Sequence, residues 1–280
     1  MGMRSLCYLN GKIVPVDKAC VGVYDIGLLR GFAIYEALVT YNRKPFQLDD
    51  HLARFRRSAK SLALKIPDSD GKIRAIINEL VRRSIPKNKE AIIRFILTGG
   101  KAIDGIDYEY ERPTFYILVE EFKQLPEKYL ARGCSLIMFE QQRQFAESKT
   151  TNYIQAVLLQ KARKKAGALE ILYVSDGKVL EASTSNFFIV KKNTVITAKR
   201  GILKGITRKV TIDLAKSHFP LKEREIRVKE LYSADEAFIT SSFKDVVPVV
   251  KIGGRKIRNG KVGPVTKEIM RLFKEYTRNY

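Results

Sequence analysis

Four segments decide what this chain folds into: KTTNY at 149–153, EASTSN at 181–186, LKGITR at 203–208 and TSS at 240–242. The first segment opens a helix that we expect to run to residue 165. The second follows a predicted strand at 178–181. The third is a glycine turn that leads into another predicted helix, and the fourth ends a predicted strand. Together they offer a lysine amine, a carboxylate, a helix N-terminus and a group of hydroxyls.

This set of groups suits pyridoxal 5'-phosphate. A lysine amine can form a Schiff base with the cofactor's aldehyde, and a carboxylate can pair with its pyridine nitrogen. Backbone N–H groups at a helix N-terminus, joined by hydroxyls, form a cradle for a phosphate. Taken alone, each feature has a plain alternative: a surface lysine, a solvated carboxylate at a strand end, and a simple Gly-Thr helix cap.

Composition describes a soluble globular chain of one or two domains, with 280 residues, 45% hydrophobic and 29% charged. The apolar runs are too short to span a membrane, and the first residues lack the apolar core of a signal peptide. Three cysteines, an odd number, fit reduced thiols in a cytoplasm. With two histidines the chain cannot assemble the usual zinc ligands, so we expect no metal.

The net charge of +22 raises the alternative of a nucleic-acid-binding protein. The lysines and arginines are dispersed, however, and no nucleic-acid-binding motif accompanies them. We therefore expect a solvated basic surface, with attraction of anionic ligands as the alternative, and neither nucleic-acid nor membrane partners.

Element prediction divides the chain into a first domain at 1–122, a linker at 123–132 and a second domain at 133–280. In the first domain Asn10-Gly11 predicts a hairpin turn. The other elements expected there are strands at 34–41, 91–97 and 115–120, and helices that include 52–62 and 73–80. In the second domain we expect a helix after Gly205 and a last helix after Pro264. The strands expected in the second domain lie at 136–139, 169–174, 178–181, 187–190, 194–198, 236–240 and 252–257.

In order and spacing these segments resemble the class IV (fold-type IV) pyridoxal-phosphate enzymes, which include D-amino acid aminotransferases, branched-chain aminotransferases and aminodeoxychorismate lyases. The resemblance implies a two-domain α/β (α+β) fold, with a small N-terminal α/β domain and a larger C-terminal pseudo-barrel domain. It also implies a homodimer. The N-terminal signature, Asp25-x-Gly27…Gly31…Tyr35-Glu36, lines the substrate pocket in this family, partly from the neighbouring subunit.

The resemblance implies roles for individual residues. Lys149 becomes the Schiff-base lysine and proton shuttle, and Glu181 pairs with the pyridine nitrogen, although Ala182 stands where the family usually has glycine. The further cofactor-binding residues would be Arg54, Ser183, Leu203, Gly205, Ile206, Thr207, Ser241 and Ser242. Of these, Arg54 lies off the apolar stripe of its predicted helix, so an exposed cation is the alternative to a phosphate contact.

The resemblance points to two different substrate specificities. Tyr35-Glu36, ILKGITR at 202–208 and NGKVG at 259–263 are similar to D-amino acid aminotransferases, whereas GPVT at 263–266 resembles branched-chain enzymes. Known D-specific members carry an arginine after the threonine that matches Thr98, where this chain has Gly99. Arg30 and Arg94 are the available replacements. Arg30 stands in the pocket-lining segment, where a buried cation would need an anionic partner, and Arg94 either points outward from its predicted strand or lines a polar pocket. The substrate residues expected are Arg30, Tyr35, Arg94 and Thr184.

The resulting hypothesis is amino-group transfer from an amino acid, with D-amino acids favoured, to a 2-oxo acid such as 2-oxoglutarate. The alternatives are a branched-chain L-amino acid aminotransferase and then an aminodeoxychorismate lyase.

Overall fold

The computed structural model describes residues 5–280, which form two compact units. The first unit consists of residues 5–123 together with 148–152 and Tyr280, and the second consists of residues 124–147 and 153–279. The chain therefore leaves the first unit after Lys123 and returns to it for five residues that include Lys149. Residues 124–132 of the expected linker belong to the second unit and contain a short helix, α4 (Glu127–Arg132).

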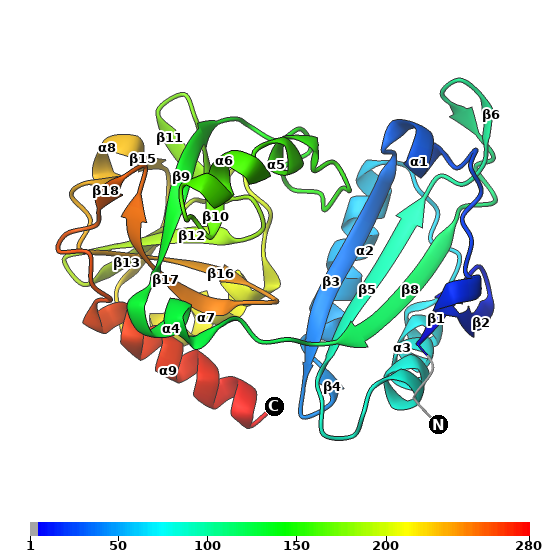
Figure 1. The fold of residues 1–280 in the computed structure, drawn as a ribbon, viewed down its shortest axis with the longest axis horizontal. Coiled ribbons are helices and arrows are strands. Elements are labelled where there is room, and N and C mark those ends of the chain that lie inside the picture. Colours follow the sequence, from blue (N-terminus) through cyan, green and yellow to red (C-terminus); the bar gives the residue numbers. More distant parts are fainter. Residues whose placement is uncertain (1–4) are drawn as a thin grey trace. The chain divides into compact units, whose positions relative to one another are not determined.

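A six-stranded antiparallel sheet forms the centre of the first unit, in the order β2-β1-β8-β5-β3-β4 (Figure 1). Its strands are β1 (Leu6–Leu9), β2 (Lys12–Pro15), β3 (Ala33–Tyr41), β4 (Lys44–Pro45), β5 (Ala91–Thr98) and β8 (Phe115–Glu121). Between β1 and β2, Asn10 and Gly11 have φ values of 45° and 94°, which confirms the expected type I′ turn.

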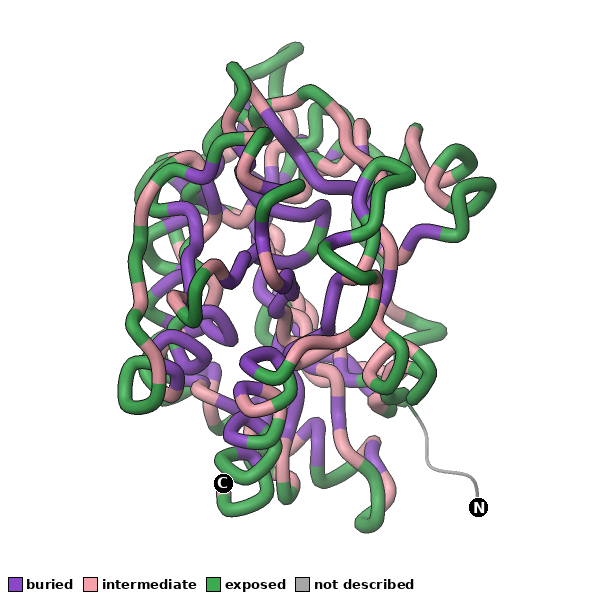
Figure 2. The backbone as a smooth tube through the Cα atoms, turned by 90° about the vertical axis from the view of Figure 1, so that its left-hand side faces the viewer, coloured by how far each residue is buried: buried purple, intermediate pink, exposed green. Residues whose placement is uncertain are grey.

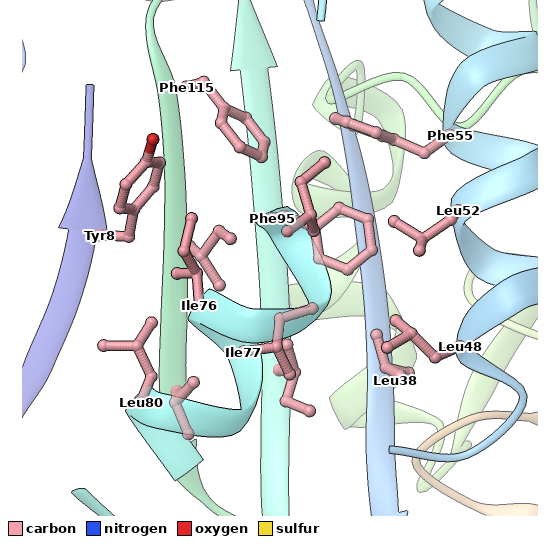
Figure 3. Close-up of a cluster of buried hydrophobic side chains, with 14 of the residues drawn as sticks. Tyr8, Leu38, Leu48, Leu52, Phe55, Ile76, Ile77, Leu80, Phe95 and Phe115 are labelled. Atoms are coloured by element: carbon pink, nitrogen blue, oxygen red, sulfur yellow. The ribbon is translucent and has the colours of Figure 1, made fainter. Parts of the chain in front are cut away.

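Two helices, α2 (Leu48–Ser61) and α3 (Asp70–Ser84), cover one face of this sheet. Figure 3 shows the core they form, in which Phe55 of α2 meets Phe95 and Phe115 of the sheet. Each large apolar side chain buried in this way contributes on the order of 1.5–3 kcal/mol. Alternation along β5 places Ile93 and Phe95 under the helices and Arg94 on the opposite face.

Short elements lie at the end of the same sheet where β3 begins and β5 ends. They are α1 (Ile26–Arg30), β6 (Ala102–Asp104) and β7 (Asp107–Tyr108), whereas η1 (Val16–Lys18) follows β2 (Figure 1). Asp25 caps α1 by accepting the backbone N–H of Gly27 at 2.8 Å, and its other oxygen accepts the Thr98 hydroxyl at 2.9 Å. Gly31, with φ of 67°, ends the helix in the left-handed region. The N-terminal signature is thus a capped turn fixed to β5.

The second unit is built on a ten-stranded mixed sheet that curls into a half-barrel (Figure 1). Nine strands follow the order β14-β13-β12-β16-β17-β9-β10-β11-β15, and β18 pairs with β17. The strands are β9 (Cys134–Glu140), β10 (Glu170–Ser175), β11 (Lys178–Ala182), β12 (Asn186–Lys191), β13 (Thr194–Thr197), β14 (Leu221–Glu223), β15 (Ile226–Arg227), β16 (Glu236–Ser241), β17 (Asp245–Ile252) and β18 (Arg255–Lys256). This mixed α/β arrangement confirms the fold class expected from the sequence.

The remaining helices belong to the second unit. They are α5 (Ile154–Leu158), α6 (Gln160–Lys165), α7 (Ile206–Lys216), α8 (Val228–Leu231) and α9 (Pro264–Arg278). Helices α7 and α9 contact each other and the β16–β17 part of the sheet. Pro264 at the first turn of α9 confirms the expected start, and the helix alternates between buried and exposed residues (Figure 2).

Two expected elements are wrong in position. No helix begins at Lys149, because residues 148–152 are extended and bonded to the first unit, so that helix begins only at Ile154. The expected strand at 252–257 is really the end of β17 followed by two residues of β18. Pro248, within β17, interrupts the local strand pattern, yet it pairs opposite Phe238 in the sheet. In both places long-range pairing overrides the local pattern.

Among residues 5–280, no helix is both long and apolar enough to cross a bilayer. Cys7, Cys20 and Cys134 are free thiols.

Candidate functional site

The backbone of Lys149 is fixed to β3 and α2 in the first unit. Its carbonyl accepts the N–H of Tyr35 at 2.9 Å, and its own N–H donates to the Ser58 hydroxyl of α2 at 3.1 Å. The next residue, Thr150, forms an antiparallel bridge with Ile34. A lysine held in this way by backbone bonds keeps its position when its side chain changes.

The side chain of Lys149 lies against Tyr35. Its Nζ donates to the Tyr35 hydroxyl at 3.2 Å and stands 4.4 Å from the centre of the ring. Tyr35 is only partly buried, as is Lys149. The structure thus joins two residues that the sequence assigned to different roles, one to the cofactor and one to the substrate.

Arg94 lies on the same sheet face as Tyr35, because β3 and β5 pair Ala37 with Arg94 in antiparallel register. It forms an ion pair with Glu120 of β8, and its side chain is 33% exposed. Burial lowers the pKa of the Arg94 guanidinium, and the nearby Tyr35 opposes that shift. Arg94 is therefore a half-buried cation on the sheet face that carries the tyrosine contacting Lys149.

Arg54 is buried rather than exposed, so the exposed-cation alternative is wrong. Its Nε and Nη2 donate to the two carboxylate oxygens of Glu36, each at 2.7 Å. Nδ1 of His51 lies 2.7 Å from the same carboxylate. Arg54 is off the apolar stripe because it faces a buried charge on β3, and Glu36 fixes the direction of its guanidinium fork.

The electrostatics of this buried group follow from its enclosure. Burial opposes ionisation of Glu36, but the charge and hydrogen bonds of Arg54 outweigh it and hold the pKa of that carboxyl well below its usual range. Burial lowers the pKa of His51, against the opposing pull of Glu36. A neutral His51 donates from Nδ1, and its Nε2 has no hydrogen-bond partner within the described residues.

Arg30 departs from the expectation of a buried cation. It is the last residue of α1, it is exposed, and its Nη1 donates to the carbonyl of Leu29 at 3.0 Å. The physical reason is the shortness of α1, whose single buried residue is Ile26. Among the described residues of the first unit, no contact brings Arg30 to Tyr35 or Lys149.

In the second unit Glu181, at the end of β11, is 5% exposed and is held from both sides. Nε of Arg143 donates to its Oε1 at 3.0 Å, and Nη2 of Arg143 donates to the same oxygen. The side-chain amide of Asn186 and the N–H of Leu203 donate to Oε2 at 3.2 Å and 3.1 Å. A carboxylate fixed by four donors keeps a single orientation.

Asn186 joins this carboxylate to the glycine turn. Its Nδ2 also donates to the carbonyl of Leu203 at 2.8 Å. A Cβ at Gly205 would lie 2.0 Å from Oδ1 of Asn186, so only glycine fits beside it. Gly205 is the N-cap of α7 and has an ordinary φ of −65°, so close approach is what requires glycine here.

The start of α7 offers backbone donors. No side chain caps it, and the first N–H that bonds back into the helix is that of Lys209 to Gly205. The N–H groups of Ile206 and Thr207 therefore belong to the unsatisfied first turn of the helix, where anions bind well. Both of these residues are buried.

The hydroxyl-rich turns lie at neighbouring strand ends, because β12 and β16 pair Asn186 with Thr240. The Ser241 hydroxyl is a buried oxygen with no hydrogen-bond partner among the described residues, and Ser242 is half-buried. Ser183 and the backbone N–H of Thr184 donate to the buried carboxylate of Glu170 at 3.1 Å and 2.6 Å. Ser183 is thus committed to a carboxylate.

Several of these contacts were not predicted from the sequence. Arg143 lies in a connection without periodicity, and Glu170 belongs to no motif, so nothing local could indicate them. Asn186 could have been found, since it ends the segment EASTSN. Glu36 and His51 stand in quoted segments, but their partnership with Arg54 needs the register of α2 on β3.

The residues of the second unit fit pyridoxal 5'-phosphate. The unpartnered Ser241 hydroxyl and the first turn of α7 are donors suited to a phosphate, and Glu181 is a fixed acceptor for a protonated pyridine nitrogen. In the first unit, Lys149 supplies a primary amine on a fixed backbone. Ala182 adopts ordinary strand geometry, with its N–H bonded to the carbonyl of Ser185 at 2.8 Å, so this turn accepts a residue other than glycine.

Comparison with known proteins supports the same chemistry. The family model for the class IV amino-transferases matches residues 33–252. A putative branched-chain-amino-acid aminotransferase of Methanocaldococcus jannaschii is 34% identical over 96% of this chain and 95% of its own length. A D-alanine aminotransferase of Bacillus licheniformis is 30% identical, covering 93% of each chain.

The fold agrees with these relatives. The T.th. branched-chain amino acid aminotransferase, solved with pyridoxamine 5'-phosphate, has a TM-score of 0.91 and 27% identity, covering 100% of this chain and 96% of its own. Class IV aminotransferases use pyridoxal 5'-phosphate as cofactor. From the family model, the extent of the relatives and the fold, this chain belongs to the class IV aminotransferases.

Proposed function

We propose that this aminotransferase moves the amino group of a D-amino acid to a 2-oxo acid such as 2-oxoglutarate. The observation that carries the proposal is the contact of the Lys149 amine with Tyr35, on a sheet face that also bears Arg94. It combines a reactive amine with a cation suited to a substrate carboxylate.

The cofactor supplies an aldehyde that bonds amines and a ring that accepts electron density. Lys149 would hold the cofactor through its amine between turnovers. As a free amine it would take the proton from the α-carbon of the donor and would later return a proton to the acceptor. Glu181 would accept a hydrogen bond from the protonated pyridine nitrogen, and Leu203 would pack against the ring. Ser183 belongs to the turn beside Glu181.

The phosphate is bound by Gly205, Ile206 and Thr207 at the start of α7, by Ser241 and Ser242, and by Arg54. The support for Arg54 is its buried, oriented guanidinium. Arg54→Ala should weaken cofactor affinity by about 1.5–3 kcal/mol, the range for hydrogen bonds to charged groups. Arg54→Lys should restore only part of this. Unchanged affinity in a cofactor titration of Arg54→Ala would limit Arg54 to its pairing with Glu36.

The substrate carboxylate is bound by Arg94 and Tyr35, with Thr184 and Arg30 as further contributors. Known D-specific members place an arginine at the position of Gly99, but a Cβ there would lie 2.8 Å from Ile26 and 2.9 Å from Tyr108. No side chain fits at that position without movement of its neighbours. Arg94 pairs with the carboxylate of Glu120, whose side chain is 58% exposed, and ion pairs with so exposed a partner exchange readily.

A specific observation favours the branched-chain alternative. The Methanocaldococcus jannaschii protein, a putative branched-chain-amino-acid aminotransferase, is 34% identical to this chain, whereas the D-alanine aminotransferase is 30% identical. Lys149 takes the proton from one face of the substrate. The side of the pocket that binds the α-carboxylate therefore decides whether the D- or the L-amino acid reacts.

A half-reaction separates the two substrate classes. The loaded enzyme is mixed separately with D-alanine, D-glutamate, L-leucine and L-glutamate, and the absorbance of the lysine-bound cofactor is followed as it converts to the pyridoxamine form. We expect rapid conversion by the D-amino acids, and a higher substrate requirement in Arg94→Ala with unchanged colour. Conversion by L-leucine alone would establish the branched-chain activity instead.

The enzyme is a homodimer in this proposal, and an apolar surface of the first unit supports it. Exposed apolar residues gather at α1 and at the β6–β7 hairpin, which are joined by hydrogen bonds of 2.8 Å from Ile26 to Gly100 and from Ala102 to Tyr24. They are Val23, Tyr24, Leu28, Leu29, Ile103, Ile106 and Tyr110, each 41% exposed or more. Light scattering should give twice the chain mass, and Leu28→Glu with Ile106→Glu should give monomers. A wild-type monomer would rule out the dimer.

The proposal places the enzyme in the cytoplasm, which three free thiols support. Cell fractionation that recovers the protein with secreted or envelope proteins would contradict it.

A further inference from the structure

Glu170 is a buried carboxylate that no step above uses. It begins β10, is 3% exposed, and lies beneath the turn between β11 and β12. Its oxygens accept the N–H of Thr184 at 2.6 Å, the Ser183 hydroxyl at 3.1 Å and the Ser185 hydroxyl. One carboxylate thus binds three successive residues of this turn.

A second loop reaches the same carboxylate. Lys244, in the turn between β16 and β17, places its Nζ 3.1 Å from Oε1 of Glu170 and donates to the Thr184 hydroxyl at 2.8 Å. The Lys244 side chain is 18% exposed, so this pair is largely shielded from solvent. Burial opposes the ionised form of Glu170, but the charge of Lys244 and the donors of the turn outweigh it and lower its pKa.

Both loops carry groups proposed to bind the cofactor. The first turn ends at Asn186, whose amide holds Glu181 and the carbonyl of Leu203. The second loop contains Ser241 and Ser242, and the N–H of Lys244 bonds to the carbonyl of Ser241 at 3.2 Å. A shift of either loop would therefore move a cofactor-binding group, because each of these groups lies within three residues of a bond to Glu170 or Lys244.

We propose that Glu170 and Lys244 are positioning residues, a buried ion pair that locks the 183–186 turn and the 241–244 loop together so that Asn186, Glu181 and Ser241 hold one geometry. This inference rests on the proposed cofactor roles of Glu181 and Ser241. Neither Glu170 nor Lys244 touches the reacting atoms. Their effect is on how well the site is preorganised, which adds binding energy without a new contact to the ligand.

The test measures cofactor affinity and thermal stability in Glu170→Gln, which keeps the size of the side chain and removes its charge. The matched control is Glu230→Gln, since Glu230 is also in the second unit and pairs with Arg224 at 2.8 Å, on α8. Both variants should lose thermal stability without cofactor. Only Glu170→Gln should bind pyridoxal 5'-phosphate about tenfold more weakly, with a lower kcat and an altered absorbance of the lysine-bound cofactor.

A second pair of variants covers the case in which Glu170→Gln does not fold. Lys244 lies in a turn, so Lys244→Met should fold and show the same loss of affinity, and Lys244→Arg should recover most of it. Equal cofactor affinity in wild type, Glu170→Gln and Lys244→Met would overturn the inference and leave a structural ion pair. A colourless wild type that takes up no added cofactor would overturn the proposed function itself, which is a separate result.

Discussion

The two units each bury a carboxylate beside an arginine, but they use the pair in opposite ways. In the first unit Glu36 is 0% exposed, enclosed between β3 and α2, and its two oxygens fix the guanidinium of Arg54. In the second unit Glu181 lies at a strand end, and Arg143, with an 18% exposed side chain, fixes the carboxylate.

The comparison indicates which member of each ion pair is available to bind a ligand. In the first unit, Arg54 and His51 occupy both carboxylate oxygens of Glu36. Glu36 therefore has a supporting role, and Arg54 is the group being oriented. Where the arginine and two amides hold the carboxylate at the end of β11, the carboxylate is the oriented group. The same charge pair can therefore prepare a site for an anion or for a cation.

The largest effect is expected at Lys149, the amine of the first unit. Lys149→Ala should lower turnover by about 10²–10⁴-fold or more, the range for loss of a positioned acid–base group. The protein should stay folded, because the backbone bonds of Lys149 to Tyr35 and Ser58 do not involve its side chain. The measurement is steady-state activity together with the absorbance of bound cofactor. Lys161→Ala, an exposed lysine on α6, is the control, and wild-type colour in Lys149→Ala would contradict the role.

Breaking the enclosed pair should cost stability. Glu36→Gln leaves the buried cation of Arg54 without its counter-charge, which typically costs about 3–5 kcal/mol. Glu79→Gln is the control, because Glu79 forms an exposed pair with Arg83 at 2.8 Å and its loss should cost less than about 1 kcal/mol. Urea unfolding of both variants measures the difference, and similar midpoints would show that enclosure of Glu36 adds nothing.

The same carboxylate predicts a dependence on pH. Because the folded-state pKa of Glu36 is depressed, its stabilisation is complete above the unfolded value of about 4.3 and is lost as pH falls below it. His51, whose pKa is also lowered, adds a loss that begins below about 6.5, since the unfolded ring binds a proton there and the buried ring does not. Wild-type Tm should fall from pH 7 to pH 4, and His51→Gln should flatten the upper part of this curve. An identical slope in His51→Gln would remove His51 from the account.

In the second unit a smaller effect is expected from Arg143→Ala. Glu181 keeps its bonds to Asn186 and Leu203, so the carboxylate stays in place but loses its charged partner. We expect cofactor affinity to fall by about 1.5–3 kcal/mol, the range for hydrogen bonds to charged groups. Arg271→Ala, which removes an exposed pair with Glu268, is the control. Unaltered cofactor binding in Arg143→Ala would show that the two amides alone orient Glu181.

The smallest effect is expected at Gly205. Gly205→Ala places a Cβ where Oδ1 of Asn186 now lies, so Asn186 must move, at a cost of about 1–3 kcal/mol. The movement of Asn186 should lower cofactor affinity as well as Tm, because Asn186 also holds Glu181. Gly71→Ala in α3, where nothing lies within 4 Å, should leave both quantities nearly unchanged. Equal results for the two glycines would mean that the turn adapts freely.

The sequence by itself determined those features that depend on neighbours along the chain. The turn at Asn10-Gly11 adopts positive φ values as expected, and the apolar periodicity of α2, α7 and α9 predicts their buried faces. The order of Lys149, Glu181 and the glycine turn before Thr207 was enough to indicate the family, since a motif is local in the chain.

Tertiary structure alone decided which groups meet. The local pattern predicts a helix from Lys149, because nothing nearby in the sequence shows that residues 148–152 pair with β3. Arg54 is buried because Glu36 lies opposite it across a helix–sheet contact, and Arg30 is exposed because α1 is too short to bury its end. Glu170, Arg143 and Lys244 act through partners 14 to 74 residues away, such as Thr184, Glu181 and Glu170. Such pairings depend on the register of distant strands, and that register is fixed by the energy of the whole core rather than by any local pattern.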